Sequence, residues 1–104
     1  PGRQFDIIYS MEFMYYLDNP FQMLSNIHDK WLKPGGLFIA GIDHYQENKP
    51  SLLWEQNLNV AMYTRSAQEW EDMMEDCNFI NTHQVQVNQK DDWAGTLIFW
   101  GAKK

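Results

Sequence analysis

The sequence predicts one α/β domain in which two parallel strands precede an antiparallel hairpin, with helices flanking the sheet. Three observations predict this class. A strand, a helix and a second strand follow one another between Phe5 and Ile42, and such a crossover is right-handed, which makes the strands parallel. A later amphipathic helix carries a clear start signal. The end of the chain then changes to the two-residue period of strands.

The first strand is expected from Phe5 to Tyr9. This apolar run is interrupted only by Asp6, as is typical of a strand buried on both faces of a parallel sheet. A helix should begin at Asp18-Asn19-Pro20, because Asn19 can cap free backbone N–H groups and Pro20 fits the first helical position. The core-facing stripe of this helix comprises Pro20, Phe21, Leu24, Ile27 and Trp31.

The segment Lys33-Pro34-Gly35-Gly36 is expected to stop that helix and turn the chain into a second strand, Leu37 to Ile42. Pro34 cannot continue a helix, and glycine adopts positive φ without steric cost. We assign these residues a turn and no ligand, because ligands of open α/β sheets bind beyond the carboxyl ends of the strands.

Two further helices are expected after a polar loop over residues 43–49. The first opens at Pro50 and places Trp54, Leu58, Ala61 and Met62 on one side. The second follows a capping box formed by Ser66 and Glu69. Its apolar stripe has helical spacing and comprises Trp70, Met73, Met74 and Cys77.

The remaining chain predicts a hairpin. His83, Val85 and Val87 alternate with glutamines, which indicates a strand with one polar face. Residues 89–95 are rich in turn formers, and Thr96 to Trp100 forms a final strand.

Composition excludes several classes of function. The 104 residues are 44% hydrophobic, enough for one core, and the net charge of −6 disfavours nucleic acid, whose affinity rests on Lys and Arg. No apolar run is long enough to span a membrane, and no signal peptide is apparent. Cys77 is the only cysteine, so we expect a reducing compartment, the cytoplasm. Because the chain begins with Pro1, it is expected to start inside a longer protein.

Candidate site residues follow the two parallel strands, whose carboxyl ends should be neighbours. Those after the first strand are Ser10, Met11 and Glu12, and those after the second are Asp43, His44 and Tyr45. His44 and Tyr45 are the candidates for catalysis, because histidine titrates near neutrality and can accept a proton from a nucleophile. Asp43 either orients that imidazole or ends the strand.

Two other polar residues have alternative roles. Glu47 and Asn48 either contact an acceptor or cap the helix beginning at Pro50, and capping is the more common role for such residues. The three histidines, His28, His44 and His83, belong to different elements, so no metal site is predicted.

Nearly the whole chain, and most securely Phe5 to Ile42, resembles class I S-adenosylmethionine-dependent methyltransferases, and the group acting on small molecules is the most similar. The resemblance rests on three segments, from the fourth to the fifth strand of that family: Phe5 to Ser10, Tyr16 to Pro20, and Trp31 to Ile39. It implies a Rossmann-like sheet in which the last strand inserts antiparallel beside the fifth. It further implies that Ser10, Met11 and Glu12 contact the cofactor, and that Tyr15 and Tyr16 flank an acceptor pocket. As substrate-binding residues we therefore take Tyr15, Tyr16, Asp43, Glu47 and Asn48.

The family's glycine-rich loop and the acidic residue that holds the cofactor ribose have no counterpart in this sequence. The only adjacent glycines, Gly35 and Gly36, stand in another context, so the backbone cradle for the cofactor is absent. Residues 1–104 are therefore expected to be the C-terminal part of such a domain, with a partial sheet and no activity alone.

Two hypotheses of function remain. In the first, the chain belongs to an enzyme that moves a methyl group from S-adenosylmethionine to a small-molecule acceptor. In the second, it is a non-catalytic half-fold that forms a homodimer, by edge pairing or swapping, through the strand edge left by the missing N-terminal half. A nicotinamide-dependent enzyme is a weaker third alternative, because the hairpin and the Lys-Pro-Gly-Gly turn are less expected there.

Overall fold

A four-stranded mixed sheet organises the chain in the computed structural model, which describes residues 3–58 and 61–104. Its strands are β1 (Phe5–Met11), β2 (Leu32–Ile42), β3 (Ile80–Val87) and β4 (Thr96–Ala102), in the order β1-β2-β4-β3. β1 and β2 are parallel, whereas β4 is antiparallel to both neighbours. The predicted α/β class, the parallel pair and the inserted antiparallel last strand are therefore confirmed.

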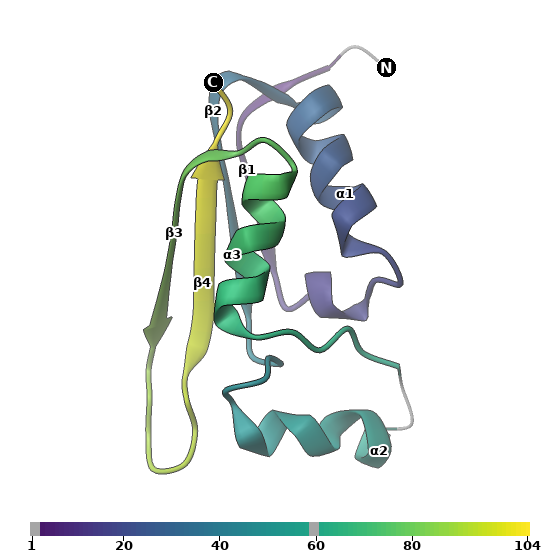
Figure 1. The fold of residues 1–104 in the computed structure, drawn as a ribbon, viewed down its shortest axis with the longest axis vertical. Helices are drawn as coiled ribbons and strands as arrows, with labels where there is room; N and C mark the ends of the chain where they lie inside the picture. Colours follow the sequence, from purple (N-terminus) through teal and green to yellow (C-terminus); the bar gives the residue numbers. More distant parts are fainter. Residues whose placement is uncertain (1–2, 59–60) are drawn as a thin grey trace.

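Helices α1 (Pro20–Asn26) and α3 (Ala67–Asp76) lie on the same side of the sheet (Figure 1). Both start as expected. The Asn19 side chain accepts a hydrogen bond from the Gln22 backbone N–H, and Ser66 forms a complete capping box with Glu69. A 3₁₀ turn, η1 (Met14–Tyr16), precedes α1, and a π-helical segment, η2 (Ile27–Trp31), extends it into β2.

The predicted turn at Lys33-Pro34-Gly35-Gly36 is instead a bulge inside β2. The register changes from Phe5 paired with Leu32 to Ile7 paired with Leu37. Residues 33–36 of β2 therefore face a single residue of β1 and do not continue the regular pairing. Gly35 has φ +83°. Its N–H donates to the Lys103 carbonyl, and the Lys103 N–H donates to the Gly36 carbonyl. The C-terminal residues thus supply the partners that the sequence pattern alone could not reveal.

The predicted helix from Pro50 to Met62 is much shorter. A 3₁₀ segment, η3 (Lys49–Leu53), leads into α2 (Trp54–Leu58), and residues 59 and 60 lie outside the described part of the chain. Leu58 is 58% exposed, and Met62 lies outside the helix, where its N–H donates to Glu55 Oε2 at 2.7 Å. The Met62 N–H therefore bonds to a side chain, whereas in the predicted helix it would have bonded to a backbone carbonyl four residues earlier. Ala61 is likewise not helical.

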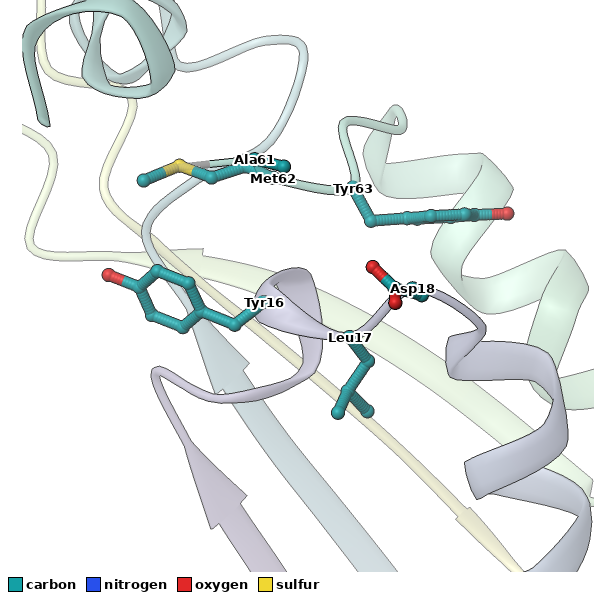
Figure 2. Close-up of a pocket in the computed structure, with 6 residues that line it drawn as sticks. All are labelled: Tyr16, Leu17, Asp18, Ala61, Met62 and Tyr63. Atoms are coloured by element: carbon teal, nitrogen blue, oxygen red, sulfur yellow. The ribbon is translucent and has the colours of Figure 1, made fainter. Parts of the chain in front are cut away.

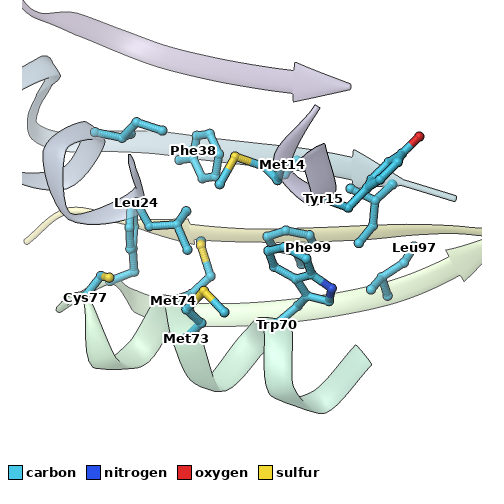
Figure 3. Close-up of a cluster of buried hydrophobic side chains, with 14 of the residues drawn as sticks. Met14, Tyr15, Leu24, Phe38, Trp70, Met73, Met74, Cys77, Leu97 and Phe99 are labelled. Atoms are coloured by element: carbon cyan, nitrogen blue, oxygen red, sulfur yellow. The ribbon is translucent and has the colours of Figure 1, made fainter. Parts of the chain in front are cut away.

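The core lies between the sheet and helices α1 and α3 (Figure 3). Trp70 of α3 stacks on Phe99 of β4 with ring centroids 5.5 Å apart. The predicted core role of Cys77 is confirmed, since its side chain is buried and burial raises the pKa of the thiol to about 11. The other central members include Met14, Leu24, Phe38, Met74 and Leu97.

The opposite face of the sheet carries apolar side chains that are exposed on β1 and half-buried on β2 and β4. Alternation along β1 sends Ile7 and Tyr9 to this face, where they are 64% and 69% exposed, and the outer edge of β1 pairs with no strand of the described chain. Strands in parallel sheets are normally buried on both faces. We call this surface, formed by Ile7, Tyr9, Ile39, Ile98 and Trp100, the bare face.

Candidate functional site

The carboxyl ends of β1 and β2 lie side by side and form the rim of the candidate site. Met11 is in register with Gly41, and the Glu12 N–H donates to the Gly41 carbonyl at 2.7 Å. The Asp43 N–H donates to Glu12 Oε1 at 3.3 Å. The two loops that the sequence placed together are therefore joined by direct hydrogen bonds.

Glu12 links the loop after β1 to the loop after β2. Its backbone has φ +55°, an unusual conformation for a non-glycine residue, and this turns the carboxylate toward the second loop. Oε1 also accepts a hydrogen bond from the Tyr15 hydroxyl at 2.9 Å. Burial raises the pKa of Glu12 above its usual 4.5, while the Tyr15 hydrogen bond opposes the shift. Glu12, which the sequence predicts to contact the cofactor, thus also holds the two loops together through its hydrogen bonds.

Asp43 does not orient the imidazole of His44. Its Oδ1 accepts a hydrogen bond from the Thr96 hydroxyl at 2.6 Å, which ties the end of β2 to the start of β4. Of the two roles considered for Asp43, the structure shows the one that finishes the strand.

His44 is buried beneath the rim with both ring nitrogens engaged. Nδ1 lies 2.9 Å from the Ser51 carbonyl, so it carries the proton, and the Thr64 hydroxyl donates to Nε2 across 2.6 Å. The ring lies near those of Tyr15 and Trp54. Burial lowers the pKa of His44 below 6.5, although the Ser51 carbonyl and the nearby charge of Glu55 oppose the shift. The imidazole is therefore placed to hold the loop, and it does not reach the open rim.

This environment predicts a pH-dependent stability. Because the folded state lowers the pKa of His44, the unfolded chain binds the proton more readily, so stability rises with pH. The contribution is fully present above pH 6.5 and is lost as the pH falls below that value. The group facing Nε2 is the Thr64 hydroxyl, and the nearest carboxylate is Glu55.

We expect urea unfolding of the parent chain to show a steeper loss of stability from pH 7 to 5 than that of His44→Gln. His83→Gln, on the surface of β3, serves as the matched control. Equal slopes for the parent and His44→Gln would contradict the assignment of a buried neutral imidazole.

Tyr45 points away from the rim. Its hydroxyl donates to the Gly95 carbonyl at 2.7 Å and accepts from Gln86 Nε2 at 3.1 Å. The side chain is fully buried, and burial raises the pKa of the phenol. The structure therefore does not bring this predicted catalytic residue to the site, because the residue after His44 enters the space below the β3–β4 connection.

Glu47 and Asn48 stabilise the loop after β2, but neither caps the helix at Pro50. Glu47 Oε1 instead accepts from the Ala67 N–H at the start of α3, at 2.9 Å. The buried Asn48 amide donates to the Asp43 carbonyl and accepts from the Ala94 N–H. The two side chains thus connect distant segments to the loop.

Ser10 and Met11 reach the two faces of β1. The Ser10 hydroxyl is buried and has no hydrogen-bond partner among the described residues. Buried hydroxyl groups without a partner are uncommon in native structures. Met11 packs against Gly41, where an added Cβ would lie 2.5 Å from its sulfur.

Tyr15 and Tyr16 both belong to η1 but have different surroundings. Tyr15 is buried, and its ring centroid lies 4.5 Å from that of the half-exposed Tyr16. Tyr16 borders a cavity of about 160 Å³ (Figure 2). The sequence analysis missed the other members of this lining, which are Leu17, Asp18, Ala61, Met62 and Tyr63. No periodic pattern marks them, because they meet only through folding.

Between residues 3 and 58 and from 61 onward, no three His, Cys, Asp or Glu side chains are grouped to hold a metal ion. Over the same ranges, no helix has the length and hydropathy needed to cross a membrane.

Comparison with solved structures identifies the fold. A methyltransferase of Haloferax volcanii, in complex with the Trm112 methyltransferase activator, matches with a TM-score of 0.78 and 25% identity over 95% of this chain. A S-adenosylmethionine-dependent methyltransferase from Thermotoga maritima, described as a possible histamine N-methyltransferase, matches with a TM-score of 0.82 and 20% identity over 97% of the chain. No protein-family model matches the sequence, and comparison with curated proteins gave no match.

A third structure contains a ligand. The N-methyltransferase NodS from Bradyrhizobium japonicum, in complex with S-adenosylhomocysteine, matches with a TM-score of 0.64 and 16% identity over 99% of the chain. The present chain spans 54%, 57% and 48% of these three proteins. It therefore has the class I methyltransferase-like fold over about half the length of the proteins it resembles.

Proposed function

We propose that this chain forms the C-terminal part of a domain that transfers a methyl group from S-adenosylmethionine to a small-molecule acceptor. The observation that carries the proposal is the rim, where Glu12 joins the carboxyl ends of two parallel strands. Ligands of open α/β sheets bind beyond such ends. In this proposal Ser10, Met11 and Glu12 face the cofactor, and the buried, unpartnered Ser10 hydroxyl supports a polar contact there.

Methyl transfer of this kind requires little acid–base catalysis from side chains. Methyl transfer to a nucleophile depends mainly on aligning donor and acceptor and on excluding water. This agrees with a rim at which His44 is buried and neutral and Tyr45 is turned away. We assign His44 the role of positioning the loop that closes over the acceptor, rather than that of a general base.

The chain alone should not turn over substrate. The glycine-rich cradle is absent from its sequence, and within the described residues the outer edge of β1, beside the bare face, pairs with no strand. A preceding glycine-rich half would add a strand to β1 and cover Ile7 and Tyr9, as burial on both faces of a parallel sheet requires. The buried Cys77 thiol and the net charge of −6 fit a cytoplasmic enzyme without a nucleic-acid substrate.

Calorimetric titration with S-adenosylmethionine tests this function. We expect no saturable binding to the 104-residue chain, and saturable binding to a chain that continues upstream through a glycine-rich half. Nicotinamide dinucleotide is the control ligand and should not bind. Failure of the extended, folded chain to bind S-adenosylmethionine would overturn the proposal, and tight binding by the 104 residues alone would overturn our account of the missing cradle.

A second candidate function is self-association without catalysis, which the exposed apolar edge of β1 favours. Sedimentation analysis should then show a homodimer that Tyr9→Lys dissociates. Leu52→Lys, at an exposed apolar position in η3, is the matched control and should leave the dimer intact. A monomeric parent chain would exclude this alternative.

A further inference from the structure

The cavity beside Tyr16 is formed by contacts between segments that are distant in sequence. The Tyr63 N–H donates to the Tyr15 carbonyl at 2.7 Å, and the Met62 N–H is held by Glu55. These bonds fix residues 61–63 above the connection between η1 and α1. The cavity is open to solvent on one side, and its volume of about 160 Å³ is close to that of a cavity that accommodates benzene. It can therefore hold a small head group.

Its lining combines one carboxylate with aromatic and thioether groups. Figure 2 shows the Asp18 carboxylate beneath the side chain of Tyr63, while the side chains of Tyr16 and Met62 lie across the opposite part of the cavity. Within the described part of the chain, Asp18 forms no ion pair and no cationic side chain lines the cavity. A carboxylate beside aromatic faces is a favourable environment for an organic cation.

The ring of Tyr63 already binds a cation elsewhere. The Arg65 guanidinium lies 4.1 Å from its centroid, but Arg65 lines the adjoining cavity with Glu69 and Asp72. The contact with Arg65 shows that this ring takes part in cation–π pairing. The carboxylates of Glu12 and Glu55, together with the net charge of −6, add to the attraction of a cation toward this part of the molecule.

The two neighbouring tyrosines of η1 lie between the cavity and the rim, with their rings tilted by 35°. Tyr16 lies 4.5 Å from Tyr15, and the Tyr15 hydroxyl donates to Glu12 at the strand ends. A molecule with one end in the cavity would therefore extend toward the place assigned above to the methyl donor.

We propose that the cavity formed by Tyr16, Asp18, Met62 and Tyr63 binds an ammonium group of the methyl acceptor. As a description of the acceptor, this rests on the proposed function. Because a protonated or quaternary nitrogen has no lone pair with which to attack, the bound group anchors the acceptor and is not the atom that becomes methylated. The acceptor is thus a small cationic molecule whose nucleophile is separate from its ammonium group.

The test uses two probes of the same shape, choline and its uncharged carbon isostere 3,3-dimethylbutan-1-ol, in NMR titrations of the 104-residue chain. We expect choline to shift the resonances of residues 16–18 and 62–63 and to bind about threefold to tenfold more tightly than the isostere. Equal affinities, or shifts confined to other residues, would overturn the proposal.

Variants show which side chains cause the preference for choline over its uncharged isostere. Asp18→Asn should reduce it to at most about twofold, because the shape is kept and the charge is lost. Asp6→Asn removes one negative charge at an exposed site on β1 and should leave the preference unchanged. Tyr63→Phe should retain it, and Tyr63→Leu should weaken it. An Asp18→Asn protein with the parent preference would contradict the assignment.

These titrations contain no S-adenosylmethionine, so they fail or succeed independently of the methyltransferase proposal. Choline binding in a protein whose extended form ignores S-adenosylmethionine would support the cation site and reject the enzyme. Cofactor binding without a choline preference would support the enzyme and reject a cationic acceptor.

Discussion

Replacing Trp70 with alanine is expected to lower the free energy of unfolding by about 3–5 kcal/mol. Trp70 is fully buried at the centre of the core, stacks on Phe99 and meets the edge of the Tyr63 ring at 5.8 Å. Alanine would leave a cavity between α3 and the sheet that the rigid strands cannot fill. Since small domains have about 5–15 kcal/mol of stability in all, urea unfolding followed by circular dichroism should detect the change easily.

Two companion variants separate the loss of the ring from other effects. The buried Trp70 indole N–H has no hydrogen-bond partner among the described residues, so Trp70→Phe removes an unsatisfied donor while keeping most of the stacking, and should cost less than about 2 kcal/mol. Gln68→Ala, on the exposed side of the same helix, should cost no more than about 0.5 kcal/mol. Similar losses for Trp70→Ala and Gln68→Ala would contradict the packing described.

Gly95→Ala is expected to be the second most damaging substitution, with a loss of about 3 kcal/mol or more. Gly95 has φ +96°, and a Cβ there would lie 2.3 Å from the Val87 carbonyl oxygen. Relieving that clash requires movement of the β3–β4 connection, which carries the carbonyl that accepts from Tyr45.

Gly35→Ala is the matched control. Its φ is +83°, but an added Cβ would meet nothing within 4 Å, so only the left-handed strain of about 1–2 kcal/mol applies. Urea unfolding of both variants measures the difference. Equal losses would show that backbone conformation alone, rather than the contact with Val87, determines the cost at Gly95.

Local signals predicted most of the fold. The alternating and continuous apolar runs gave the strands, and Asn19, Ser66 and Glu69 gave the helix starts, because capping is decided within a few residues. Tertiary partners decided the rest. Gly35 and Gly36 were predicted to form a turn, but their backbone groups pair with Lys103, about seventy residues later in the chain by the printed numbering.

The site was predictable only in part, for a similar reason. That the loops at Glu12 and Asp43 meet follows from parallel strands, and hydrogen bonds confirm it. That His44 would be buried under Thr64, or that Tyr45 would reach Gly95, depends on contacts between distant segments. The cavity at Asp18 and Tyr63 left no pattern in the sequence at all.

The central claim is that the rim at Ser10 to Glu12 and at Asp43 is half of a methyl-donor site. Hydrogen–deuterium exchange of the upstream-extended chain, with and without S-adenosylhomocysteine, tests it most directly. We predict that the ligand slows exchange at residues 10–12 and at Asp43, while the bulge at Pro34 to Gly36 at the other end of β2 is unaffected. Protection at the bulge with none at the rim would contradict the claim.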